Sequence, residues 1–63
     1  MLTLTVAEQM QCINAVRDEL AEITFMIAVV ANGNTKVYQA LTGPRSTHYK
    51  LTKTLARMRR DLP

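Results

Sequence analysis

The side chains of this sequence that are best suited to chemistry are the basic residues of its second half. They are Arg45, Lys50, Lys53, Arg57, Arg59 and Arg60. Lysine and arginine neutralise phosphates, and the serine and threonine hydroxyls among them would add phosphate hydrogen bonds. Four of the six, from Lys50 to Arg60, are spaced by three, four and three residues, which puts them on one side of a helix. The pattern predicts a surface that binds an acidic partner, above all nucleic acid.

The distribution of charge favours the same hypothesis. Residues 1–32 carry one basic and four acidic side chains, net −3, whereas residues 33–63 carry seven basic and one acidic, net +6. This asymmetry is typical of a chain that meets an acidic partner, either a nucleic acid or an acidic protein surface. Two alternatives stay open: the two halves attract each other, or the basic side chains form an ordinary solvated face.

No set of residues predicts catalysis or metal binding. A nucleophile needs a base and usually a third group that orients the base. The single cysteine and single histidine, Cys12 and His48, are far apart in the sequence. We expect Cys12 to be a small buried or interfacial hydrophobic residue, and His48 to pack at the start of the last helix. The sequence therefore predicts a protein that is not an enzyme and that holds no metal or cofactor.

The first half predicts one long helix. Thr5 and Glu8 have the spacing of a capping box, so a helix should begin at Val6, and Asn32-Gly33 should end it. Apolar residues recur within it at the a and d positions of a heptad. This heptad stripe consists of Val6, Ile13, Val16, Leu20, Ile23, Ile27 and Val30. We predict that it is the interface of a homodimer or larger homo-oligomer.

A second interpretation of the middle of the chain is a β-hairpin. Residues 23–30 are rich in β-branched side chains, and Asn-Gly is a strong hairpin signal. Strands over 24–30 and 35–40 would then pair within an α+β fold. The helix is favoured, because the heptad period runs through Ile27 and Val30 and because residues 35–40 alternate poorly.

Two shorter helices should follow. Asn34 is placed to cap a helix over 35–42, which Gly43-Pro44 ends. Ser46 is placed to cap a third helix that reaches Arg60 or Asp61. Its apolar residues lie on the side away from its basic residues. A short helix, a turn and a basic helix are compatible with a helix-turn-helix, although Pro44 is unusual in that turn.

Residues 1–63 thus predict a single all-α domain with a long N-terminal, a short middle and a basic C-terminal helix, packed as a helical-bundle homo-oligomer. A helix of about 26 residues spans ~39 Å, whereas a compact chain of this size is ~27 Å across, so part of the stripe needs a second copy. The apolar segment 25–31 is too short to span a membrane, and the lone cysteine suits the cytoplasm.

The functional hypothesis is a small regulatory protein that self-associates and binds nucleic acid through its last helix. The aromatic residues are few, so stacking on single strands is not favoured. One alternative is a regulator or inhibitor that binds a protein, of the kind that phages and plasmids encode. The other is a protein that binds small anionic nucleotides at a subunit interface.

Overall fold

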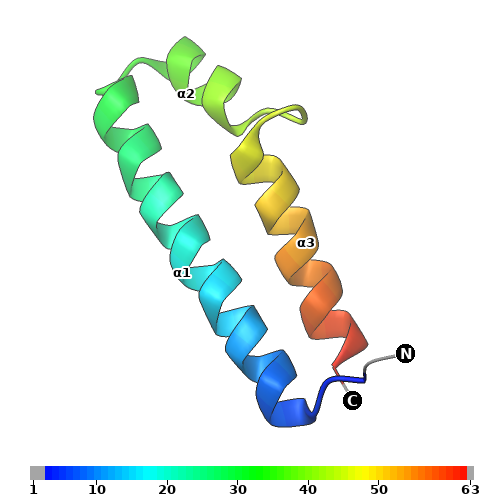
Figure 1. Ribbon diagram of the computed structural model, residues 1–63. Helices are drawn as coiled ribbons and strands as arrows, with labels where there is room; N and C mark the ends of the chain where they lie inside the picture. Colours follow the sequence, from blue (N-terminus) through cyan, green and yellow to red (C-terminus); the bar gives the residue numbers. More distant parts are fainter. Residues whose placement is uncertain (1–2, 63) are drawn as a thin grey trace.

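The computed structural model describes residues 3–62 and confirms the all-α fold, with every helix where the sequence predicts it. The helices are α1 (Val6–Ala31), α2 (Thr35–Thr42) and α3 (Thr47–Asp61). Figure 1 shows α1 and α3 side by side and antiparallel, with α2 closing one end of the hairpin. The molecule measures 44 × 18 × 17 Å. Its length follows from α1, which is longer than the helix packed along it.

Helix α1 begins with the predicted capping box. The Thr5 hydroxyl accepts a hydrogen bond from the Glu8 amide at 3.1 Å, and the Glu8 carboxylate accepts one from the Thr5 amide at 3.0 Å. These two bonds satisfy amides that have no partner inside the helix. The bond from the Thr5 amide is the main cause that lowers the pKa of Glu8 below its ordinary value of 4.5, because it stabilises the ionised carboxylate, and the Thr5 side chain adds to this effect.

The alternative hairpin over 24–40 is wrong. Residues 24–30 belong to α1 and residues 35–40 to α2, and Asn32-Gly33 closes a helix instead of turning a strand. Asn32 has a φ of 46° and Gly33 a φ of 80°, the left-handed conformation that ends many helices. The Asn32 amide donates to the Ala28 carbonyl at 3.1 Å. Packing of the buried Ile27 and Ala31 outweighs the strand preference of the β-branched residues beside them.

The two following helices have the predicted caps. The Asn34 carboxamide oxygen accepts from the Lys36 and Val37 amides at 3.1 and 3.2 Å. The Ser46 hydroxyl accepts from the Tyr49 amide at 3.1 Å and donates to the Gly43 carbonyl at 2.6 Å. A Cβ on Gly43 would come within 3.1 Å of the Gln39 carbonyl oxygen, so this close turn favours glycine. Helix α3 therefore starts from a tight, hydrogen-bonded turn.

The core is thin and lies between α1 and the other two helices. The buried residues are Ile13, Ile27 and Ala31 of α1 and Leu55 of α3. Among the other members of the heptad stripe, Val16, Leu20 and Ile23 are half-buried, and Val6 and Val30 are exposed. The middle of the stripe is thus covered within a single chain and its two ends stay exposed, in line with the expectation that one chain covers only part of it. Its role between chains stays a prediction.

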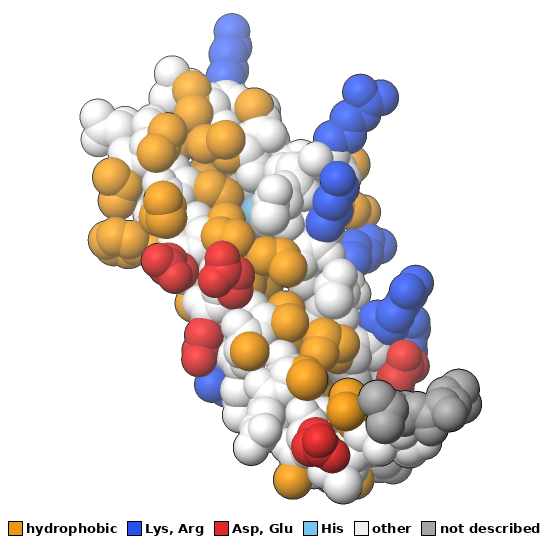
Figure 2. All heavy atoms as spheres, in the orientation of Figure 1, with side chains coloured by type: hydrophobic (Ala, Val, Ile, Leu, Met, Phe, Trp, Pro, Cys, Tyr) orange, Lys and Arg blue, Asp and Glu red, His pale blue; other side chains and the backbone are white. Residues whose placement is uncertain are grey.

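Other apolar side chains of α1 remain in contact with solvent. Phe25, Met26, Val29 and Val30 are all more than half exposed. Figure 2 shows hydrophobic side chains gathered over the upper, C-terminal half of α1. No helix in residues 3–62 combines the length and apolarity that crossing a bilayer requires.

Candidate nucleic-acid interface

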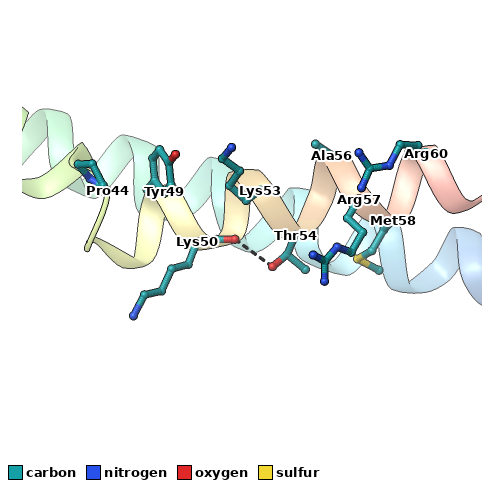
Figure 3. A pocket seen from close by; sticks show the side chains of 9 residues that line it. All are labelled: Pro44, Tyr49, Lys50, Lys53, Thr54, Ala56, Arg57, Met58 and Arg60. Carbon is teal, nitrogen blue, oxygen red and sulfur yellow. Dashed lines mark hydrogen bonds between the residues drawn. The ribbon is translucent and has the colours of Figure 1, made fainter.

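Most basic side chains of α3 lie on the face of this helix that is turned away from α1. Four of them and Tyr49 line a shallow depression of about 600 Å³ (Figure 3). Eight of the nine lining residues come from α3 and the ninth is Pro44, so the depression is an open surface along one helix. We call it the basic face and define it by Lys50, Lys53, Arg57 and Arg60, all of which are exposed.

The spacing of residues in α3 explains how this face forms. Leu55 is buried against the rest of the chain, and half-buried Leu51 and Met58 lie within a turn of it on the same side. Successive helical residues are rotated by about 100°, so Lys53 and Arg57, each two positions from Leu55, point away from the core. Figure 2 shows the resulting row of Lys and Arg side chains along the α3 edge of the molecule.

The charges of α1 and α3 do not neutralise each other through ion pairs. Within residues 3–62 one ion pair forms, between Arg17 and Asp18 of α1 at 3.5 Å, and both partners are more than half exposed. Such a pair contributes little to stability. The idea that the acidic and basic halves attract one another therefore has no ion pair between these helices to support it, and the basic face keeps its full charge toward solvent.

Three of the hydroxyl groups near the basic face already donate hydrogen bonds to backbone carbonyls. Thr52 donates to the His48 carbonyl at 2.8 Å, and Thr54 donates to the Lys50 carbonyl at 2.9 Å. Ser46 donates within its own turn, as described above. A hydroxyl has a single proton, so none of the three can donate to a phosphate without giving up its present bond. Any phosphate contacts of this surface would therefore come chiefly from lysine and arginine.

Tyr49 adds a contact that the sequence analysis did not identify. The Lys53 ammonium lies 5.5 Å from the centre of the Tyr49 ring. Tyr49 precedes Lys53 by about one helical turn. An exposed cation–π contact of this kind contributes about 0.5–1 kcal/mol. The spacing of four residues between an aromatic and a lysine was the available signal. The contact orients Lys53 and covers one face of the ring.

Two of the six predicted basic residues lie outside the basic face. Arg45 lines a separate hollow at the turn between α2 and α3, together with residues of that turn. Arg59 is two positions from Arg57, hence about 200° further around the helix, and does not line the depression. The structure thus brings together four of the six residues.

The histidine and the cysteine take part in no catalytic arrangement. His48 is half-buried, and its Nε2 lies 3.1 Å from the Thr24 hydroxyl, a bond that joins α3 to α1. Cys12 is exposed, so it is not buried within one chain, and the alternative that it lies at an interface between chains stays a prediction. No group of three or more histidine, cysteine or acidic residues that could hold a metal ion is present in residues 3–62.

Helices α2 and α3 are not arranged as in a DNA-binding helix-turn-helix. In that motif the second helix projects so that its N-terminal residues reach base edges in the major groove. Here α3 lies along α1 (Figure 1), and its basic face extends along the helix from Lys50 to Arg60. Comparisons with family models, curated proteins and solved structures found no match to this chain. Its function must therefore be inferred from its own surfaces.

Proposed function

We propose that the protein binds the phosphate backbone of double-stranded nucleic acid through the basic face. The observation that carries the proposal is a row of four basic side chains on one helix face, with no acidic residue among those that line it. From Lys50 to Arg60 the row spans ~15 Å, the length of about four base-pair steps. Lysine and arginine contacts to phosphates position a protein on a duplex but carry no sequence information. The proposed binding is therefore largely independent of sequence.

The aromatic residues favour a duplex over a single strand. Binding of single strands relies on aromatic rings on which successive bases stack. Tyr49 is the aromatic residue of the basic face, and Lys53 lies over its ring. Tyr38 and Phe25 belong to α2 and α1 and do not line this face. A stacking platform is thus not built beside the four charges.

A pair of arginines on one helix tests the proposal. Arg57→Ala removes a charge from the basic face, and Arg59→Ala removes the same charge from another side of α3. We expect Arg57→Ala to weaken binding to all duplex sequences alike and to reduce the salt dependence by about one contact. Arg59→Ala should leave the salt dependence close to that of the unchanged protein. Fluorescence anisotropy with labelled duplex DNA and duplex RNA measures both.

The outcome of this comparison separates the hypotheses. Equal effects of the two substitutions would mean that net charge, and not this face, determines binding. Absence of binding at 50 mM salt and tens of micromolar protein would remove nucleic acid and leave an acidic protein as the partner of the same face. The exposed thiol of Cys12 fits the reducing cytoplasm, which we propose as the location.

A further inference from the structure

The outer side of α1 carries an apolar patch that the chain leaves uncovered. We define it by Phe25, Met26, Val29 and Val30, which are 70%, 56%, 60% and 66% exposed. Together these side chains expose on the order of 400 Å², which matches the largest patch of a typical monomer and is often functional. An apolar hollow between Met26, Val30 and Leu41 of α2 extends the patch on one flank.

Two members of the apolar patch lie nearly opposite the side of α1 that packs in the core, and Met26 and Val30 lie on the flank between the two sides. Phe25 and Val29 are each two positions from the buried Ile27, which corresponds to about 160° around the helix. Helices α2 and α3 pack against the core side. The patch is therefore an outer surface, and nothing else in residues 3–62 covers it.

Charged residues at the two ends of the patch indicate what can cover it. Asp18, Glu19 and Glu22 lie on the same side of α1, one to two turns before Phe25, and all three are exposed. Figure 2 shows acidic side chains below the hydrophobic group. At the other end, exposed Lys36 lies in the first turn of α2. One end of the patch is therefore negative and the other positive.

We propose that a second copy of this chain docks on the apolar patch, with the two α1 helices antiparallel. A two-fold axis near residue 27 packs Phe25 of each copy against Val29 of the other, because an isologous contact pairs residues reciprocally. In this register Asp18 of each copy lies beyond Ala31, the last residue of the other copy's α1, toward the turn that leads to Lys36, and so stays away from the other copy's carboxylates. A parallel arrangement would instead stack the three carboxylates on themselves, which is unfavourable.

The charges beside the patch argue against a lipid surface, and its area indicates a weak dimer. An anionic lipid surface fits the patch poorly, because the three carboxylates on the same side would be repelled by it. Two patches bury on the order of 1,000 Å² with their rims, the low end for specific interfaces. The dimer is thus reversible and depends on protein concentration.

The dimer would carry two basic faces and so bind two duplexes, a consequence that rests on the proposed function. In each copy α3 packs on the side of α1 away from the patch, and its basic face points outward from α1. The helices of the dimer therefore stack in the order α3, α1, α1, α3. The two basic faces point in opposite directions, so one dimer holds two separate duplexes and does not bind two half-sites of one duplex.

Sedimentation equilibrium from 5 to 500 μM tests the dimer without nucleic acid. We expect reversible dimers for the unchanged chain and a monomer for Val29→Asp, which buries a charge at the contact. Met10→Asp is the matched control, an exposed apolar residue of the same helix outside the patch. Circular dichroism confirms that each variant keeps its helices. A monomer throughout this range, or dimers that Val29→Asp leaves unchanged, would overturn the proposal.

Disulfide formation tests the orientation. In a Cys12→Ser background, Met26→Cys lies near the two-fold axis and should form dimers on mild oxidation. Ala15→Cys lies on the same side of α1 but ~18 Å from the axis, so it should not. Cross-linking of both variants would show a parallel dimer and contradict the antiparallel one. Because neither experiment contains nucleic acid, its result is independent of whether the basic face binds duplexes.

Bridging is measured with two duplexes, one immobilised and one labelled. The unchanged protein should retain the labelled duplex on the surface, and Val29→Asp should bind single duplexes without retaining a second. Arg57→Ala should weaken single-duplex binding and retention alike, because it changes the basic face and not the apolar patch. Retention by a Val29→Asp variant that is monomeric would contradict the bridging arrangement.

Discussion

Helices α1 and α3 differ in how much of their apolar surface is buried within the chain. Helix α3 has apolar residues on one side and most of its charges on the other, so packing against α1 buries or half-buries Leu51, Leu55 and Met58 and leaves the basic face exposed. Helix α1 has apolar side chains at all positions from 25 to 30. A neighbour on one side buries Ile27 but cannot reach Phe25 or Val29. This difference is the reason that we propose a charged partner for α3 and an apolar partner for α1.

Aspartate substitutions on the two sides of α1 should give the largest contrast. Ile13 is 5% exposed, and a carboxylate there would cost several kcal/mol, comparable to the whole stability of a domain this small. We expect Ile13→Asp to unfold the chain, and half-buried Leu20→Asp to do the same less completely. Val29→Asp should keep the helical content, since its side chain is already in water. Urea denaturation followed by circular dichroism measures all three.

A different result for Ile13→Asp would change the role of the heptad stripe. If this variant stayed folded and became monomeric, the stripe would be the interface between chains, as the sequence predicts. The intramolecular core would then be less important than its burial indicates.

The N-caps of the two helices provide a smaller contrast. Ser46 makes two hydrogen bonds in a partly buried turn, whereas Thr5 makes its cap in full contact with solvent. Loss of a cap costs about 0.5–2 kcal/mol. We expect Ser46→Ala near the upper end of this range and Thr5→Ala near the lower end, measured as shifts in the free energy of unfolding. The reverse order would show that the turn before α3 contributes less than its geometry indicates.

The smallest expected effect is a pH dependence confined to α1. The capping bonds lower the pKa of Glu8, so its ionised form is favoured by folding. This contribution is complete above pH 4.5 and is lost as the pH falls through the lower pKa of the folded state. Helix α3 has no acidic residue in its first turn. The stability difference between the unchanged chain and Glu8→Gln should therefore shrink below pH 4.5, and a constant difference from pH 7 to pH 3 would contradict this.

The helix bounds could be predicted because each rests on local signals. The three helices begin directly after Thr5, Asn34 and Ser46, and all three residues cap their helices as expected. The basic face followed from residue spacing in the same way. Arg45 and Arg59 were included because they are near in sequence, but residues near in sequence need not share a face.

The surfaces of α1 were harder to predict, because they depend on which side the rest of the chain covers. The sequence holds a second run with three- and four-residue spacing: Ala15, Asp18, Glu22, Phe25 and Val29. This spacing was the available signal for a second, outer face of α1. The first three residues of the run are small or acidic, so the run does not read as an apolar stripe. The hydrogen bonds of Thr52 and Thr54 to their own helix depend on side-chain rotamers, which residue types alone do not determine.

The salt dependence of duplex binding tests the central claim most directly. Four phosphate contacts per chain give a log–log slope near about −3.6, so the affinity of one chain should fall roughly 150-fold between 50 and 200 mM salt. The Lys53→Ala/Arg57→Ala double variant should halve that slope and lose only about 12-fold over the same range. A slope near zero for the unchanged protein, or equal slopes for the two proteins, would contradict the assignment of the basic face.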